Sequence, residues 1–245
     1  MSTPARLRAG TSAHVRAFVR RPLHVLFLVV LPPVVIEVYG MAMATFPELP
    51  FLSAPPATMG RINGAVFAAA FLAGLIGLFQ VRSAAQADER LRLSGFRRAE
   101  LFCSRLAVIV AVSLLATLAS FAVLAQSTTV TAPLVAIGSL LLGSLLYGLI
   151  GILVGAVAPG ELEGSLVLVF LADFDDFLSS GLVEIDSPVV NYTPLHYPHT
   201  LFTDAVQSGT VAAGDVGGGL AYLAVLAALS LAVYVWTTGT GGVLS

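Results

Sequence analysis

The sequence predicts an all-α membrane protein, and two observations lead to this fold class. First, 57% of the 245 residues are hydrophobic and 11% are charged, whereas about a quarter of the residues in a soluble domain are charged. Second, apolar runs of about 20 residues, the length that crosses a hydrocarbon core of roughly 30 Å, recur along most of the chain. Because a helix satisfies its own backbone hydrogen bonds in lipid, these runs predict a bundle of transmembrane helices.

Six apolar runs are expected to span the membrane. The second, third, fourth and sixth runs contain no charged residue, the first contains Glu37, and the fifth contains three aspartates. The expected spans cover 22–43, 62–81, 106–125, 133–158, 165–183 and 218–238. Together they form one six-helix transmembrane domain over residues 22–238.

Residues 1–21 precede the first span and carry five arginines among scattered apolar residues such as Leu7 and Phe18. This pattern suits a basic amphipathic helix that lies on the inner membrane surface. The alternative is a partly ordered positive tail that only sets topology. A cleaved signal peptide is not expected, because the apolar run from Pro22 and the segment before it are both longer than such signals have.

The placement of arginine sets the expected topology. All 12 basic residues are arginines, and 11 of them lie before the first span or in the segment 82–105 between the second and third spans. Basic residues stay on the cytoplasmic side, so both termini and the 82–105 loop are expected in the cytoplasm. The outer loops, including 184–217, then hold acidic residues and the single arginine Arg61. The chain is therefore expected to be a multi-pass protein of the cytoplasmic membrane.

The chain contains no lysine, which excludes several chemistries. A Walker A phosphate loop, a pyridoxal Schiff base and a retinal linkage all need one. Any work driven by ATP therefore requires another chain to bind the ATP. The single cysteine, Cys103, excludes an intrachain disulfide and a multi-cysteine metal cluster, and it is expected to be a buried apolar side chain.

Two features inside the spans concern packing. Pro32 and Pro33 remove backbone donors from the first span and are expected to kink it. The fourth span carries small residues at spacings that let helices approach closely in lipid: Ser139, Gly143, Gly148, Gly151 and Gly155. The close approach can be made within the chain or against a second copy, and the sequence leaves both open.

The 82–105 loop combines charge with apolar side chains. Ser94-Gly95 is expected to interrupt two short helical stretches, because serine is a good N-cap and glycine loosens the turn before it. Phe96, next to Arg97 and Arg98, is typical of an anchor that a protein partner grips. The alternative is a solvated positive loop that only fixes topology.

Together these features resemble the permease subunit of ABC-2 type transporters. The resemblance covers nearly the whole chain and rests on four segments: Arg-Arg-Pro-Leu before a first span with Pro32-Pro33, the loop Glu89-Arg-Leu-Arg-Leu-Ser-Gly-Phe-Arg-Arg-Ala-Glu-Leu101, Ser179-Ser-Gly181, and Asn191-Tyr-Thr-Pro-Leu-His-Tyr-Pro198. The chain departs from the family at Gly95, where proline is commoner, and this departure affects the shape expected for the loop.

The resemblance implies a non-catalytic subunit that exports a substrate, while a separate ATP-binding subunit holds ATP and Mg²⁺. This chain would then bind no cofactor, metal or nucleic acid itself. The resemblance also implies a dimer with a second permease chain, identical or different, surrounded by membrane lipid. The 82–105 loop would form a coupling helix that docks on the ATP-binding subunit through Leu93, Ser94, Gly95, Phe96, Arg97, Arg98 and Glu100.

Three aspartates lie midway along the fifth run, where an ionised carboxylate costs about 2.5–3.5 kcal/mol at a helix centre. Helical spacing puts Asp173 and Asp176 on one face and Asp175 on another. Asp173 and Asp176 are therefore candidates for a transport pathway, and a hydrated outer helix end is the alternative. A metal site at His196 and His199 is not favoured, because Pro198 between them argues against a regular helix.

Two further functions compete with the permease reading. An ion-coupled secondary carrier would use the intramembrane aspartates as its proton or cation site and would transport without ATP or a partner chain. An intramembrane hydrolase using Asp173, Asp176 and His196 is disfavoured, because the chain lacks His-Glu-x-x-His and Gly-x-Ser-x-Gly.

Overall fold

The computed structural model describes residues 22–48, 54–83, 98–180 and 188–239. Within these residues the fold is all-helical, which confirms the all-α part of the predicted fold class. Its elements are α2 (Pro22–Met43), α3 (Pro56–Ser83), α5 (Arg98–Leu124), α6 (Pro133–Val157), α7 (Glu161–Ser179), η1 (Pro188–Tyr192), α8 (His196–Gln207) and α9 (Ala213–Gly239). The segment 1–21, predicted to be an interfacial helix, lies outside the described residues.

Five of these helices, α2, α3, α5, α6 and α9, are long and apolar enough to cross a membrane. They coincide with the first, second, third, fourth and sixth predicted spans, and α2 begins and ends at the predicted residues. The fifth predicted span, 165–183, falls on α7, which is not among the five. The reason is chemical: Glu161, Glu163 and the three aspartates all lie within its 19 residues.

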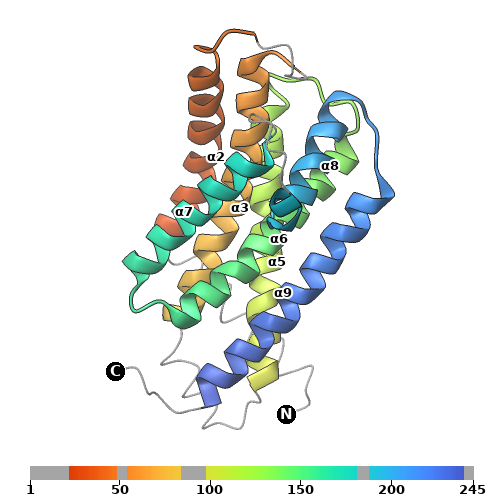
Figure 1. The fold of residues 1–245 in the computed structure, drawn as a ribbon. Helices are drawn as coiled ribbons and strands as arrows, with labels where there is room; N and C mark the ends of the chain where they lie inside the picture. The colour runs from red at the N-terminus through yellow and green to blue at the C-terminus, as the bar shows by residue number, and fades with distance from the viewer. Residues whose placement is uncertain (1–21, 49–53, 84–97, 181–187, 240–245) are drawn as a thin grey trace.

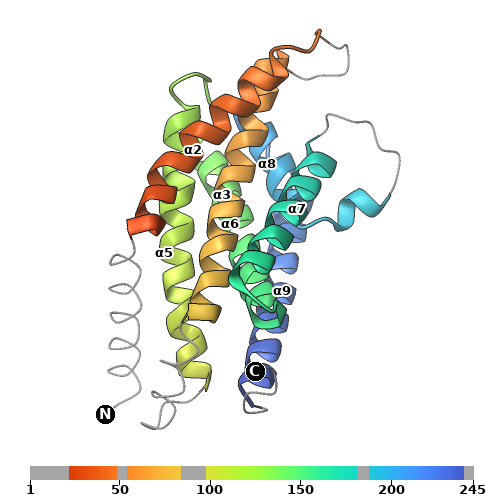
Figure 2. The same ribbon diagram turned by 90° about the vertical axis from the view of Figure 1, so that its left-hand side faces the viewer.

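The long helices alternate in direction along the chain (Figures 1 and 2). Helices α2, α5 and α7 run toward one end of the bundle, and α3, α6 and α9 run back. The start of α2 and the end of α9 therefore lie toward the same end. Helix α8 lies toward the opposite end, next to α6 and α9, and this end is called the α8 end below.

Helix α3 occupies the centre of the bundle. It packs against α2, α5, α6 and α7, and nearly all of it is buried inside the protein, whereas α2 and α9 are mostly exposed. Its buried side chains are small or aliphatic along most of its length, including Ala65, Ala69 and Leu72. The apolar character of α3 therefore serves contact with other helices, while that of α2 and α9 suits contact with lipid.

Glycines allow α3 and α6 to approach closely. A Cβ atom on Gly151 would collide with the backbone of Gly74, and one on Gly77 would collide with the backbone oxygen of Gly148. A Cβ on Gly155 would lie 2.9 Å from the backbone oxygen of Leu78. Of the two uses that the sequence left open for the small residues of this span, the structure shows packing within the chain.

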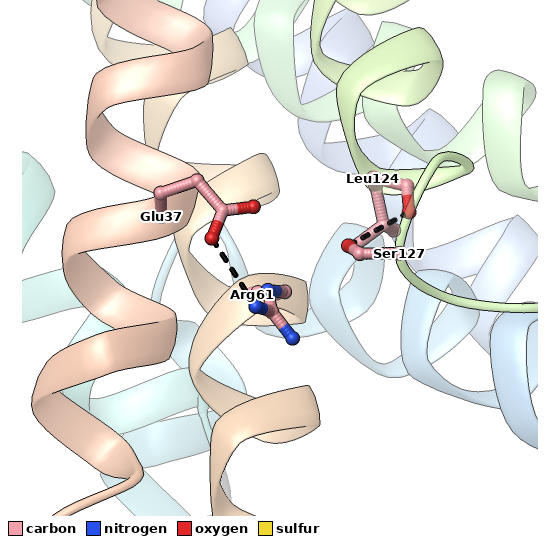
Figure 3. Close-up of polar contacts among 4 residues, drawn as sticks. All are labelled: Glu37, Arg61, Leu124 and Ser127. Carbon is pink, nitrogen blue, oxygen red and sulfur yellow. Dashed lines mark hydrogen bonds and ion pairs between the residues drawn. The ribbon is translucent and has the colours of Figure 1, made fainter.

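Helix α3 begins six residues earlier than its predicted span, so Arg61 lies inside a helix and not in a loop. Arg61 Nη2 lies 3.2 Å from Glu37 Oε2 of α2 (Figure 3). The one acid of the first predicted span is thus neutralised by the one arginine outside the segments that were predicted to be cytoplasmic. Figure 3 also shows how α5 ends, with the Ser127 hydroxyl donating to the Leu124 carbonyl oxygen at 3.3 Å.

Cys103 lies on α5 and is exposed, so the expectation that it is buried is wrong. It falls on the same helical face as Val110 and Leu114, which are seven and eleven residues further on and are also exposed. This outward face of α5 is apolar, so the small hydrophobic character of cysteine fits it as well as it would fit a core.

The contact between α3 and α6 gives a stability prediction. We expect Gly151→Ala to destabilise the protein by about 1–3 kcal/mol, because the added methyl group would push the two backbones apart. Gly138→Ala is the matched control on the same helix, since nothing lies within 4 Å of its added Cβ. Thermal unfolding of the purified chain in detergent checks this prediction, and equal midpoints for the two variants would contradict it.

Candidate functional site

A cavity of about 280 Å³ lies between α2, α3 and α7. Its lining combines carboxylates, aromatic rings and one carboxamide: Tyr39, Asn63, Phe170, Asp173, Phe174, Asp176 and Phe177. Helix α2 contributes the tyrosine, α3 the asparagine, and the second half of α7 everything else. Asp173 and Asp176, the two candidates that the sequence put on one helical face, therefore meet at this cavity, which is called the acidic cavity below.

The local sequence of α7 explains why one helix supplies most of the lining. Phe170, Asp173, Phe174 and Phe177 follow the spacing i, i+3, i+4 and i+7, which places them on one face of a helix. The helix starts after Gly160, whose backbone is extended, and carries two acids in its first turn, where they suit the helix dipole. It ends where the Ser180 hydroxyl donates to the Phe177 carbonyl oxygen at 2.7 Å.

Asp173 connects α7 to α2. The Tyr39 hydroxyl donates to Asp173 Oδ1 at 3.0 Å. The Tyr39 ring is held in turn by Phe67 of α3, with the two stacked ring centroids 5.7 Å apart. Asp173 is exposed at the cavity, and its second carboxylate oxygen accepts no hydrogen bond from the residues that the structure describes.

Asp176 is the chemically unsatisfied group of the acidic cavity. It is 3% exposed, and its Oδ1 has no hydrogen-bond partner within the part of the chain that the structure describes. No ion pair in residues 22–48, 54–83, 98–180 and 188–239 involves an aspartate of α7. A buried polar atom without a partner costs about 1–3 kcal/mol, and more when it is charged. Asp176 is therefore the group in the cavity that a proton or a bound cation would stabilise.

Asp175 faces away from the cavity, as the helical spacing predicted, and it is fully engaged. Its Oδ2 accepts a hydrogen bond from the Tyr147 hydroxyl of α6 at 2.7 Å. The Leu195 backbone N–H donates to Oδ1 and Oδ2 at 3.2 and 3.1 Å. Leu195 is the N-cap of α8 and has no capping side chain of its own. Asp175 therefore fastens α6, α7 and the start of α8 together, which is a structural role.

Asn63 is held in place from behind by α8. His199 is buried, and its Nε2 lies 2.9 Å from Asn63 Oδ1. The Thr203 hydroxyl lies 3.4 Å from the other ring nitrogen, Nδ1. Burial, and to a smaller extent the charge of His196, lowers the pKa of His199 to about 4. The ring is therefore neutral at pH 7, and the tautomer that carries hydrogen on Nε2 satisfies both contacts by donating to Asn63 and accepting from Thr203.

The expectation that Pro198 prevents a regular helix is wrong. Helix α8 runs from His196 to Gln207, and Pro198 is its third residue. The first N–H groups of a helix have no partner inside it, so a proline in the first turn removes no hydrogen bond.

The two histidines of α8 are nevertheless separated in role. His199 binds Asn63, whereas the His196 ring meets Tyr197 edge-on with centroids 5.1 Å apart, and burial lowers the pKa of His196 as well. Among the described residues, no group of three or more histidine, cysteine, aspartate and glutamate side chains is placed to hold a metal ion.

The predicted coupling residues fall largely outside the described part of the chain. Leu93, Ser94, Gly95, Phe96 and Arg97 lie there, while Arg98 and Glu100 belong to the first turn of α5. Helix α5 begins at the end of the bundle opposite α8 (Figure 1). The start of α5, where Arg98 and Glu100 lie, is therefore toward the end of the bundle opposite α8.

Two lining residues, Tyr39 and Asn63, were not predicted from the sequence. Each is a polar side chain inside an apolar run, and such residues in predicted spans are functional candidates by default. That signal was present but weak, because a tyrosine near the end of a span is ordinary. The three phenylalanines carried a clearer signal in their alternation with the aspartates over residues 170–177.

Comparison with known proteins adds no relative. No protein-family model matches the chain, and a search of curated proteins finds no match. The assignment of function therefore rests on the residues themselves and on the resemblance drawn from the sequence.

The buried histidine gives a pH prediction. The unfolded chain protonates a histidine near pH 6.5, whereas folded His199 does so near pH 4, so the unfolded state binds a proton first as the pH falls between these values. The titration of His199 should therefore lower the free energy of unfolding by about 3 kcal/mol as the pH drops from 6.5 to 4. His199→Gln keeps a hydrogen-bonding group and removes the titration. Its unfolding midpoint should depend less on pH than that of the natural protein, and identical pH profiles would reject the prediction.

Proposed function

We propose that this chain is the permease subunit of an ABC-2 type transporter, which exports a substrate across the cytoplasmic membrane while a separate subunit hydrolyses ATP. The observation that carries the proposal is the buried, unpaired carboxylate of Asp176 at a cavity inside a bundle of apolar helices. Ionisable groups at such places mark substrate or ion pathways in membrane proteins. The acidic cavity would be part of that pathway.

The lack of lysine supports a complex in which a separate chain binds the ATP. Without lysine this chain cannot supply the lysine that a Walker A loop places on the nucleotide phosphates. In the proposed complex ATP and Mg²⁺ lie on the ATP-binding subunit, and this chain has no catalytic residue. The proposed contact between the two is the arginine-rich loop around Phe96, and a second permease chain completes the assembly.

The distribution of side chains on α7 supports a sixth crossing. Its exposed positions are mainly apolar and include Leu166, Val167 and Phe170, while Asp175 and Asp176 are buried. A helix whose exposed side chains are mainly apolar and whose two buried acids face the protein suits lipid better than water, although Glu161, Glu163 and Asp173 are exposed. In our proposal α7 is the fifth of six crossings, and both termini of the chain lie in the cytoplasm.

One observation favours a second candidate function, an ion-coupled carrier. The unpaired Oδ1 of Asp176 would suit a proton or cation that is taken up and released during transport. Such a carrier would transport in liposomes that contain this chain alone, whereas the proposed permease subunit would need its ATPase.

Cysteine labelling tests the proposed crossing by α7. After Cys103→Ser, single cysteines at Gln126, Glu161 and Thr210, all exposed in the structure, are treated with an impermeant thiol reagent in intact cells. We expect labelling of Gln126→Cys and Thr210→Cys but not of Glu161→Cys, because α7 would separate the last two by the membrane. Thr210→Cys shielded to the same degree as Glu161→Cys would show that α7 does not cross.

Recruitment of an ATP-binding subunit tests the proposed function itself. Phe96→Ala should weaken the affinity for the proposed ATP-binding subunit by about thirtyfold and so lower co-purification with it, because truncating an interface anchor often costs about 2 kcal/mol or more. Leu91→Ala, in the same loop but outside the expected contact set, is the control.

Removing arginine charge from the loop should change the kinetics of association with the ATP-binding subunit. The paired changes Arg97→Ala and Arg98→Ala should slow association and reduce its salt dependence. If neither Phe96→Ala nor the arginine pair alters recruitment or ATP hydrolysis, the loop is only a topology signal and the ion-coupled carrier becomes the better proposal.

A further inference from the structure

The acidic cavity is selective in charge. Two carboxylates line it, and no arginine lines it in the part of the chain that the structure describes. Three of the described arginines are engaged elsewhere: Arg61 with Glu37, Arg82 with the Pro159 carbonyl oxygen, and Arg105 with the Gln80 carbonyl oxygen. The cavity therefore disfavours an anion, and the Oδ1 of Asp176, which has no partner among the described residues, would be stabilised by a positively charged ligand.

The rings around the carboxylates decide which cation fits. Phe170, Phe174 and Phe177 are 71%, 62% and 48% exposed, so their faces are open to a ligand. Aromatic faces attract organic ammonium groups, and this attraction strengthens where water is excluded. A calcium or magnesium ion would need six or more oxygen ligands. Asp173 Oδ1 already accepts a hydrogen bond from Tyr39, and Asn63 Oδ1 already lies 2.9 Å from His199 Nε2. Fewer than six side-chain oxygens of the lining are therefore available to such an ion, and the rings supply none.

The size of the cavity decides how much of the ligand it holds. Its volume of about 280 Å³ lies near the lower limit of small-molecule pockets, which is about 300 Å³. A compact head group fills such a space. The exposed phenylalanines continue the lining outward along α7, where a hydrocarbon or aryl tail would lie against them.

We propose that the acidic cavity binds an amphiphilic organic cation. Its ammonium group lies between Asp173 and Asp176, and its apolar part packs on the phenylalanines of α7. Asp176 supplies the buried charge, Asp173 supplies a second carboxylate fixed by Tyr39, and Asn63 closes the inner wall. This names the substrate class of the proposed transport function, and it rests on that function for its role in the cell.

Binding can be measured on the purified full chain without any partner. Benzyltrimethylammonium is titrated by calorimetry into the chain held in nanodiscs of zwitterionic phosphatidylcholine. We expect saturable binding that Asp176→Asn weakens by about tenfold or more, and that Phe174→Leu weakens by about threefold. Asp176→Glu, which keeps the charge, should retain most of the affinity.

Two controls separate the site from general attraction of cations. Glu161→Gln removes one negative charge from an exposed position on the same helix, outside the cavity, and should leave the affinity unchanged. Phenylmethanesulfonate, an anion of similar size, should not bind. All variants are compared after their unfolding midpoints show that they are folded.

The possible outcomes distinguish this inference from the proposed function. Absence of saturable binding, equal affinity of Asp176→Asn and the natural protein, or equal binding of the sulfonate would overturn the inference. If the chain recruits an ATP-binding subunit but fails this test, the permease function stands without a cationic substrate. If binding depends on Asp176 but no ATPase is recruited, the cation site stands and the permease function is rejected.

Discussion

The close contact between α3 and α6 is the constraint on which the rest of the structure depends. Lipid tails are as apolar as the helices, so burial of apolar surface does little to hold two helices together in a bilayer. Backbone approach and van der Waals contact must do it, and Gly74, Gly77, Gly151 and Gly155 make that approach sterically allowed. With α6 on one side, α3 receives α2, α5 and α7 on its other sides. The acidic cavity forms where α2, α3 and α7 meet.

The three aspartates within four residues of α7 differ in their hydrogen bonding because they face different neighbours. Asp175 meets donors from α6 and from the start of α8, Asp173 meets one tyrosine, and Asp176 Oδ1 meets none among the described residues. A carboxylate whose oxygens all accept hydrogen bonds holds neighbouring helices together. A buried carboxylate oxygen without a donor can instead be stabilised by a ligand or a proton. One short acidic stretch therefore serves both packing and chemistry.

The sequence predicted well what depends on local chemistry and poorly what depends on distant contacts. The bounds of α2 follow from its apolar composition, and the separation of Asp175 from Asp173 and Asp176 follows from helical periodicity. The early start of α3 did not follow, and neither did the ion pair of Arg61 with Glu37, which joins residues 24 positions apart in the chain. Tyr39 joins the site through a partner 134 residues away, and no local pattern encodes such a contact.

The hydrogen bonds of Asp175 also bear on the order in which the protein is made. Helix α7 leaves the ribosome before α8, so Asp175 has no Leu195 N–H to bind until the chain has lengthened by another 20 residues. Until then Tyr147 of α6 is the donor already at hand. A helix with three uncompensated aspartates partitions poorly into lipid by itself, at about 2.5–3.5 kcal/mol for each charge at the bilayer centre. In the proposed topology, in which α7 crosses the membrane, its insertion is expected to be a late event of biogenesis, coupled to its docking on α3 and α6 and completed by the arrival of α8.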